Sequence, residues 1–195
     1  MNDLTRRGFI FGTATAASYG LLVGVQRVCF SAFADDSADE AGFRPVTIVE
    51  FSDLGTRVGT KTLAKVRHSI EEWKRLLTPS QFQVTRRAAT EFAYSGSLYN
   101  QHAAGLYRCA DCTNALFDST AKFESGTGWP SFWKPIAPEN VREKPDTSYG
   151  LMRREVNCTL CDAHLGHVFT DGPEPTGLRY CMNSAALRFL PRRSA

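Results

Sequence analysis

Four cysteines in two short turns have the spacing of a metal site. Cys109 and Cys112 form one Cys-x-x-Cys turn, and Cys158 and Cys161 form another. Two intervening residues let one tight turn present both thiolates to the same ion, and two such turns complete the tetrahedron that structural zinc prefers. The sequence therefore predicts one structural Zn²⁺ ion bound by all four cysteines.

Other interpretations of these residues remain open at this point. In an oxidising compartment the four thiols would instead form disulfides. A Cys-x-x-Cys turn can also exchange disulfides, although neither turn lies in the βαβ context of a thioredoxin-like motif. His164 and His167 follow the second turn and are further candidate ligands, but four thiolates already satisfy zinc. The two histidines are otherwise proton donors in a cleft or hydrogen-bonded core residues.

Cys181 is left over once the two turns and Cys29, which lies in the leader described below, are set aside. If its segment is a strand, the alternation of side chains places Arg179, Cys181 and Asn183 on one face. A cation beside a thiol raises the thiolate fraction, which makes Cys181 a candidate nucleophile. A buried, unreactive thiol is the alternative, because free cysteine is among the most buried residue types.

Short strands are expected to position these residues. Pieces with high β-propensity at 106–108, 151–156, 178–182 and 185–189 alternate with turns rich in Gly, Pro, Asn and Asp. No long helical pattern separates these pieces. The sequence therefore predicts a mainly antiparallel β domain that follows a helical N-terminal segment.

One strand and two short helices are expected before this domain. Residues 46–51, Val-Thr-Ile-Val-Glu-Phe, predict a strand. Residues 69–77 predict a helix that begins with a capping box of Ser69 and Glu72. One face of this helix is expected to be apolar: Ile70, Trp73, Leu76 and Leu77. A second cap signal, Thr-Pro-Ser-Gln, starts a further helix over about 78–85.

Residues 1–34 have the pattern of an export signal. Arg6 and Arg7 precede a weakly apolar stretch over 9–25, and Ala-Phe-Ala at 32–34 matches a signal-peptidase site. A frayed amphipathic helix is the alternative. We expect twin-arginine export, with cleavage after Ala34, to the periplasm or beyond.

The mature chain is expected to divide into an extension over 35–67, with one strand, and a main domain over 68–192. The whole chain has 23 Lys and Arg against 20 Asp and Glu, a net charge of +3. This small and unclustered charge argues against nucleic acid or an anionic membrane as the main partner. No apolar run reaches the roughly 18–20 residues that a spanning helix needs, so no membrane association is expected after signal cleavage.

Three motifs resemble the signatures of type B methionine sulfoxide reductases. They are Ser-Gly-Thr-Gly-Trp-Pro-Ser-Phe at 125–132, His-Leu-Gly-His-Val-Phe at 164–169 and Gly-Leu-Arg-Tyr-Cys-Met-Asn-Ser at 177–184. The two Cys-x-x-Cys turns also match the zinc site of that family in spacing and order, and the resemblance covers most of the mature chain. It implies a mainly antiparallel β fold with short N-terminal helices. The implied activity is reduction of the R epimer of methionine sulfoxide in proteins or peptides.

The resemblance implies a nucleophile and a substrate pocket. A sulfoxide has an electrophilic sulfur, an apolar methyl group and an oxygen that gains negative charge during attack. By resemblance, Cys181 attacks the sulfur and becomes a sulfenic acid as methionine leaves. Trp129 would hold the methyl group against its indole face, with Phe169 nearby.

Polar roles follow from the same resemblance. His167 would protonate or polarise the sulfoxide oxygen, helped by Asn183. His164 and Arg179 would order water and the electrostatics around the thiol. These roles are what the family implies for the matching positions of this chain.

Two departures from the family pattern concern turnover and the pocket rim. Thr127 stands where many members carry a resolving cysteine, and after signal cleavage no cysteine outside the metal turns replaces it. We therefore expect an external thiol, such as a thioredoxin-like protein, to reduce the sulfenic acid directly. The segment Thr-Glu-Phe-Ala-Tyr at 90–94 lacks the Arg-Pro that is more common after the Glu, and Tyr99 stands near a common tryptophan position. We expect a monomer that repairs oxidised exported proteins.

Two rival functions remain compatible with the sequence. A zinc-stapled β domain can be an interaction module in which Cys181 is merely buried, since a fold does not fix a function. A Cys-x-x-Cys turn can also make the protein a thiol–disulfide exchanger. The joint presence of Cys181, Asn183, Trp129 and His167 favours the reductase, because a binding module has no need of that set.

Overall fold

The structure, a computed structural model, describes residues 44–192. The twin-arginine motif, Cys29 and the expected cleavage site after Ala34 lie outside the described residues. Within the described range, no helix is long and apolar enough to cross a membrane.

Two helices form where the cap signals predict them. Helix α2 (Ile70–Leu76) begins after Ser69, whose backbone N–H donates to Glu72 Oε2 at 2.7 Å while Glu72 N donates to Ser69 Oγ at 3.2 Å. Helix α3 (Pro79–Arg87) begins after Thr78, which forms the same reciprocal pair with Gln81. These bonds satisfy N–H groups that have no partner inside the helix. Both predicted helices are confirmed, and α3 continues to Arg87.

The apolar face predicted for α2 is wrong in part. Trp73 and Leu77 are buried, but Ile70 is 54% exposed and Leu76 is 61% exposed. Helix α2 packs through one pair spaced i, i+4, Trp73 and Leu77, which meets Phe82 of α3. One such pair covers only a narrow stripe of a helix this short, so the neighbouring apolar residues remain in contact with solvent.

Eleven strands are described, and every strand pairing among residues 44–192 is antiparallel, as predicted. Their bounds are β1 (Val46–Phe51), β2 (Arg57–Leu63), β3 (Gly105–Cys109), β4 (Ala115–Asp118), β5 (Lys122–Phe123), β6 (Ser131–Phe132), β7 (Val141–Asp146), β8 (Arg153–Cys158), β9 (His164–Phe169), β10 (Arg179–Met182) and β11 (Leu187–Pro191). Four single 3₁₀ turns connect them: η1 (Ser119–Ala121), η2 (Pro138–Asn140), η3 (Ser148–Gly150) and η4 (Ser184–Ala186).

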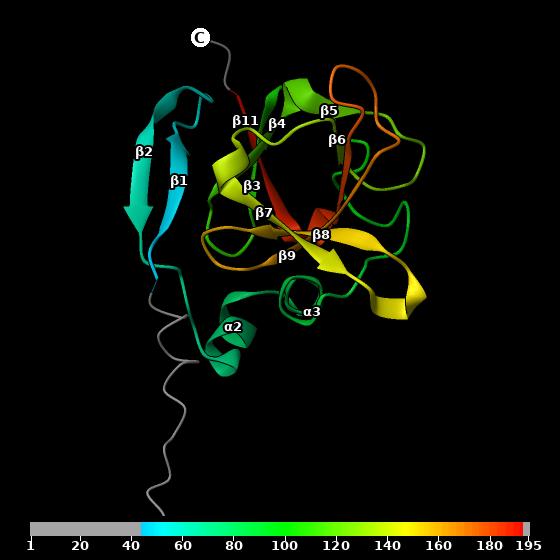
Figure 1. Cartoon of the computed structure of the whole chain (residues 1–195). Helices are drawn as coiled ribbons and strands as arrows, with labels where there is room; N and C mark the ends of the chain where they lie inside the picture. Colours follow the sequence, from blue (N-terminus) through cyan, green and yellow to red (C-terminus); the bar gives the residue numbers. More distant parts are fainter. Residues whose placement is uncertain (1–43, 193–195) are drawn as a thin grey trace, which may run out of the picture. The chain divides into compact units, whose positions relative to one another are not determined.

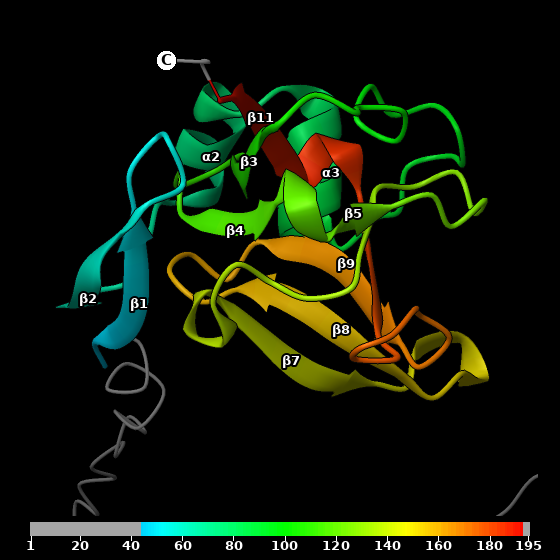
Figure 2. The ribbon, with the colours of Figure 1, turned by 90° about the horizontal axis from the view of Figure 1, so that it is seen from above.

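The strands form three sheets. The largest has the order β5-β6-β10-β9-β8-β7, a second has the order β11-β3-β4, and β1 pairs only with β2. In the cartoon, β7, β8 and β9 run side by side, and the β11-β3-β4 sheet lies to one side of them (Figures 1 and 2). Helix α3 packs against β9 and η4 (Figure 1). The segment predicted as a strand at 185–189 begins as η4, so β11 starts later, at Leu187.

Aromatic side chains fill the core between the sheets. The rings of Phe117 and Phe132 stack with centroids 4.3 Å apart, and Tyr107 meets Phe132 edge-on at 4.8 Å. All three residues are fully buried. Such offset or edge-to-face contacts add to the burial of apolar area, so these rings fix the β3-β4 pair against β6.

The predicted strand at 46–51 is confirmed, and it belongs to a hairpin. Its partner β2 was not predicted, because the sequence of β2 is mostly polar and its residues are mostly exposed. Asn140 holds the hairpin: Val49 N donates to Asn140 Oδ1 at 2.7 Å, and Asn140 Nδ2 donates to Val49 O at 2.8 Å. Ile48 joins the main core. The extension is therefore built into the domain core by side-chain contacts.

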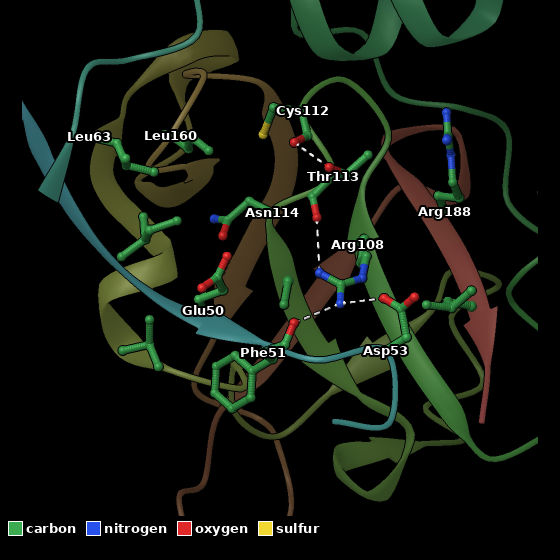
Figure 3. A pocket seen from close by; sticks show the side chains of 14 residues that line it. Glu50, Phe51, Asp53, Leu63, Arg108, Cys112, Thr113, Asn114, Leu160 and Arg188 are labelled. Carbon is green, nitrogen blue, oxygen red and sulfur yellow. Dashed lines mark hydrogen bonds and ion pairs between the residues drawn. The ribbon is translucent and has the colours of Figure 1, made fainter. Parts of the chain in front are cut away.

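Arg108 of β3 makes a second connection to the hairpin. Its Nη2 atom donates to the carbonyl oxygen of Phe51 at 2.9 Å and to Asp53 Oδ1 at 3.1 Å, across a groove of about 510 Å³ (Figure 3). The guanidinium thus satisfies backbone oxygen at the end of β1, where pairing with β2 becomes irregular.

Candidate active site

Strand β10 places Cys181 between two polar residues of neighbouring strands. Cys181 pairs in register with His167 of β9 on one side and with Ser131 of β6 on the other. Directly opposed residues of antiparallel strands point to the same face of the sheet. Tyr180 and Met182, which precede and follow Cys181, point to the opposite face and are buried in the core. The predicted alternation along this strand is therefore observed.

Gly166 allows β9 to approach β10 closely beside Cys181. A Cβ atom on Gly166 would lie 2.1 Å from the carbonyl oxygen of Cys181 and 3.0 Å from Met182 Cα. Backbone atoms of a paired strand cannot yield to such a contact, so any side chain here would push the strands apart. The glycine in His-Leu-Gly-His thus sets the distance between the two strands that carry Cys181 and His167.

A bulge at Leu165 turns the two histidines to the same side. Val156 of β8 pairs with Gly166 while Asn157 pairs with His164, so Leu165 is an extra residue in β9. Residues three apart in a regular strand point to opposite faces, and one extra residue reverses that relation. The imidazole centroids of His164 and His167 accordingly lie 5.5 Å apart.

A pocket of about 150 Å³ opens beside Cys181. A cavity of about 150 Å³ can hold a benzene molecule, so this pocket accommodates a group of a few heavy atoms. Its walls combine aromatic and polar side chains: Thr90, Trp129, Arg153, Gly166, His167, Phe169, Cys181, Met182 and Asn183. Five of the predicted site residues thus line one pocket.

An ion-pair network orients His167. His167 Nε2 lies 2.7 Å from Asp146 Oδ2, and Arg153 Nη2 donates to the same oxygen at 2.8 Å. Hydrogen bonds lower the pKa of Asp146, those from Ser148 more than the one from His167. This carboxylate is therefore ionised and accepts the Nε2 proton. That bond leaves Nδ1 as the unprotonated nitrogen of a neutral imidazole.

Burial lowers the pKa of His167 below its ordinary value. The hydrogen bond to Asp146 acts in the opposite direction, and the positive charge of Arg153 acts with burial. His167 is therefore neutral near pH 7 and can accept a proton before it donates one.

Glu91 ties the Trp129 side of the pocket to the Asn183 side. Trp129 Nε1 donates to the Glu91 carbonyl at 3.1 Å, and Glu91 N donates to Asn183 Oδ1 at 3.0 Å. The Glu91 carboxylate accepts from Ser184 N at 2.5 Å and from Ala185 N at 3.0 Å. One residue of the atypical 90–94 segment thus holds an indole, an amide and the start of η4.

The Asn183 side chain forms two hydrogen bonds with backbone atoms. Its Nδ2 atom donates to the Leu165 carbonyl at 3.1 Å, and its Oδ1 atom accepts from Glu91 N. A side-chain amide has two N–H donors, so one remains for a group in the pocket. Asn183 is therefore fixed in orientation by the loop on one side and β9 on the other.

Arg179 supports the pocket from behind Phe169. Its Nε and Nη2 atoms donate to the two carboxylate oxygens of Asp171 at 2.9 and 2.8 Å, and its guanidinium lies 4.5 Å from the centre of the Phe169 ring. A planar guanidinium can hold a carboxylate and a ring face at the same time. Arg179 thereby fixes the position of Phe169 while its charge acts on Cys181.

Burial raises the pKa of the Cys181 thiol above its ordinary value. Arg179, and hydrogen bonds with Thr127 and Ser131, lower that pKa but do not outweigh burial. The effect of a nearby cation expected from the sequence is therefore present, yet the resting site holds a thiol and not a thiolate.

The four cysteines of the two turns converge on one point. Their sulfur atoms all lie within 4.8 Å of one another, with Cys109 and Cys161 sulfurs 3.6 Å apart and Cys112 and Cys158 sulfurs also 3.6 Å apart. All four cysteines are free, and a disulfide bond would need about 2.05 Å. The cluster is thus arranged to bind one metal ion. Neither histidine belongs to a metal-binding group among the described residues.

Some predicted residues lie outside the pocket. His164 is buried behind it, with Nδ1 2.7 Å from Glu155 Oε1, and Arg179 lies behind Phe169. Arg153, Asp146 and Glu91 were not predicted from the sequence. Asp146 and Arg153 come from hairpin β7–β8, where no local pattern marks them, and Glu91 comes from the 90–94 segment, in which the sequence pointed to the pocket rim but gave the Glu no role.

Comparison with known proteins agrees with the geometry. Residues 77–191 match the family model described as the SelR domain. The chain is 54% identical over 125 residues to a peptide methionine sulfoxide reductase MsrB of Herminiimonas arsenicoxydans. The matched stretch covers 64% of this chain and 91% of that protein. Proteins of the same name from Pseudomonas aeruginosa (strain UCBPP-PA14; 51% over 132 residues, 68% and 100%) and Bradyrhizobium diazoefficiens (55% over 128 residues, 66% and 92%) are similar.

The opposing effects of Asp146 and Arg153 on His167 give a pH prediction. Asp146→Asn should lower the pKa of His167 further, because it replaces a carboxylate, whose charge and charged hydrogen bond favour the imidazolium, with a neutral amide. Arg153→Gln should raise that pKa, because it removes a like charge. NMR titration of the imidazole carbons measures both shifts. Asp118→Asn, a carboxylate on another strand, is the matched control, and shifts of equal sign in the two test variants contradict the assignment.

Proposed function

The chain belongs to the SelR-domain family and is a type B methionine sulfoxide reductase, a peptide-methionine (R)-S-oxide reductase, and we propose that Cys181 carries out its reaction by a one-cysteine cycle. One observation supports this most strongly. The register of β10 sets Cys181 beside His167 at a pocket walled by Trp129 and Phe169. Nucleophile, proton carrier and apolar wall thus meet at one small pocket.

The substrate is methionine sulfoxide in a protein or peptide. Its methyl group contacts the Trp129 indole, which Glu91 holds in place, with Phe169 on the other side. Its oxygen lies toward His167 and the free N–H of Asn183. This orientation turns the electrophilic sulfur toward Cys181. The S epimer, which has the opposite configuration at sulfur, would have to place its methyl group against the polar wall and its oxygen against the apolar one.

The proton for the leaving oxygen comes from the Cys181 thiol. Nδ1 of neutral His167 accepts it, and the imidazolium then donates it to the sulfoxide oxygen as the thiolate attacks. The bond between substrate sulfur and oxygen breaks, and a bond between the oxygen and Cys181 Sγ forms. The products are methionine and a sulfenic acid on Cys181, with no net uptake of protons.

An external thiol completes the cycle. Thr127 occupies the position of a resolving cysteine, with its Oγ1 3.9 Å from Cys181 Sγ. The described part of the chain has five cysteines, of which four form the metal cluster. The sulfenic acid therefore meets a thiol from outside, such as that of a thioredoxin-like protein, which forms a mixed disulfide and releases water. A second thiol of the reductant then attacks its own sulfur in the mixed disulfide, which releases Cys181 as a thiol and leaves the reductant as a disulfide. The protein acts as a monomer in this scheme.

Zinc is the metal proposed for the cysteine cluster. A tetrahedron with Zn–S bonds of about 2.3 Å has sulfur–sulfur edges of about 3.8 Å. The observed separations of 3.6 Å fit this size. Asn114 Nδ2 also donates to Cys158 Sγ at 3.7 Å, as suits a thiolate ligand. Zinc bound to all four thiolates supplies folding energy and takes no part in the attack.

Export is the third part of the proposal. Arg6, Arg7 and Ala-Phe-Ala at 32–34 support twin-arginine transport and cleavage, and they lie outside the described residues. Transport of a folded chain allows the metal to be loaded before export. The mature enzyme then repairs oxidised methionine in exported proteins, in the periplasm.

Turnover of separated sulfoxide epimers tests the reaction. With a dithiol as reductant, the R epimer should yield methionine and the S epimer should not. Cys181→Ser should abolish turnover, and His167→Ala or Asn183→Ala should each lose about 10²–10³-fold, the scale of a lost acid or oxyanion donor. His102→Ala, an exposed histidine on another loop, is the control. Full activity in Cys181→Ser would end the proposal.

Metal analysis of the purified full chain tests the zinc site. Elemental mass spectrometry should find about one equivalent of zinc, since the four thiolates bind one ion. Cys109→Ser should lose the metal and unfold more readily, whereas Cys181→Ser should keep it. Less than about half an equivalent in the wild-type protein would contradict a structural zinc site.

Cell fractionation tests export. The wild-type chain should be recovered in the periplasm with Asp35 as its first residue, because signal peptidase removes residues 1–34. Replacing Arg6 and Arg7 by Lys together should leave the uncut chain in the cytoplasm, and Arg27→Lys is the matched control. Recovery of uncut wild-type chain in the cytoplasm contradicts the proposal.

A further inference from the structure

Three hydroxyl groups form a chain that ends at the nucleophile. Ser131 Oγ lies 2.7 Å from Ser125 Oγ, and Ser125 Oγ lies 2.8 Å from Thr127 Oγ1. Thr127 Oγ1 in turn lies 3.9 Å from Cys181 Sγ, within the longer range of hydrogen bonds to sulfur. The attack on the sulfoxide proposed above assigns no task to these hydroxyls.

Two structural features fix the positions of these hydroxyl groups. Ser131 is fully buried and pairs in register with Cys181. Thr127 lies between two glycines whose φ angles are +70° and +90°, values that side-chain-bearing residues rarely adopt. A Cβ on the second of them, Gly128, would lie 2.8 Å from Tyr94 N. The backbone therefore presents Thr127 to Cys181 in one orientation.

The hydrogen bonds of these three hydroxyls can run in either of two directions. In the thiol state Cys181 donates to Thr127, Thr127 to Ser125, and Ser125 to Ser131. Ser131 then donates to the Trp129 carbonyl, whose oxygen lies 3.2 Å away. In the thiolate state each hydroxyl can rotate, so that Ser131 donates to Ser125, Ser125 to Thr127, and Thr127 to the sulfur. Every hydroxyl has one proton and keeps a partner in both directions.

We propose that this hydroxyl chain, Ser125, Thr127 and Ser131, stabilises the thiolate of Cys181 by reversing its hydrogen bonds when the thiol loses its proton. Thr127 and Ser131, which both contact the reacting sulfur, are then catalytic residues, and Ser125, which joins them, is a positioning residue. The inference rests on the proposed function, in which Cys181 is the nucleophile. It gives Thr127 a task at a position where a resolving cysteine is common in the family.

The Cys181 thiolate needs hydrogen-bond donors because burial limits its contact with water. Burial opposes ionisation of the thiol. Arg179, the cation nearest in sequence, directs its Nε and Nη2 protons to Asp171, so only the rest of its guanidinium and its charge act on the sulfur. Neutral donors that point at the sulfur offset the loss of hydration without placing a further charge in the pocket. Each hydrogen bond in a row of hydroxyls also polarises the next one. The Thr127 hydroxyl therefore donates to the sulfur more strongly than an isolated hydroxyl would.

The pH profile of Cys181 alkylation tests the inference. The full-length, metal-loaded protein is treated with iodoacetamide at a series of pH values, and the modified tryptic peptide 180–188 is quantified by mass spectrometry. Thr127→Val should raise the midpoint by about 0.5–1 pH unit, the scale of one lost hydrogen bond to an anion across a long contact. Thr127→Ser should keep the wild-type midpoint, because it retains the hydroxyl.

Two further variants make the result decisive. Ser125→Ala should raise the midpoint in the same direction by less, and this serine does not contact the sulfur in a hydrogen bond. Thr120→Val, which removes an exposed hydroxyl that is hydrogen-bonded to Asp118, should leave the pH midpoint of Cys181 alkylation unchanged. A wild-type midpoint in both Thr127→Val and Ser125→Ala would overturn the inference. Alkylation needs no sulfoxide, so failure here is distinct from failure of the epimer assay.

Discussion

The pairing of β10 with β6 and β9 is the constraint on which the site depends. It places Cys181 level with His167 on one side and Ser131 on the other. Because side chains alternate along a strand, a shift of one residue would turn Cys181 into the core and expose Tyr180 or Met182. Burial of those two residues holds the register, and Gly166 permits the close approach of β9 that the register requires. The fold thus aims the nucleophile by packing on the opposite face.

The metal cluster and Glu91 hold the parts around this register. Cys109 ends β3 and Cys158 ends β8, so an ion held by the four cysteines would join the three-stranded sheet to the six-stranded one. Glu91 bonds to Trp129, Asn183 and the backbone of η4, which follows β10 directly. Neither group touches the reacting atoms. Each fixes the distance between pocket walls that belong to separate segments, and a catalytic pocket tolerates little change in that distance.

The sequence predicts the parts of this site that have a local pattern. Cap residues mark α2 and α3, the spacing of the two turns marks the metal cluster, and alternation places Cys181 opposite its buried neighbours. Other features arise only from long-range contacts. The extra residue Leu165 brings His164 and His167 to one side, and burial raises the pKa of the Cys181 thiol despite Arg179. Strand β2, the network of Asp146 with Arg153, and the exposure of Ile70 likewise depend on partners that no local pattern identifies.

In the proposed cycle Cys181 takes the sulfoxide oxygen and stays a sulfenic acid until an outside thiol reduces it. A single turnover without reductant tests it most directly: the full-length, metal-loaded protein is mixed with excess R sulfoxide and dimedone, and methionine and the modified peptides are counted. We expect about one methionine per chain and one dimedone adduct, located on Cys181, with the metal retained. A disulfide between Cys181 and any other cysteine of the chain, or methionine formed without modification of Cys181, would contradict the one-cysteine cycle.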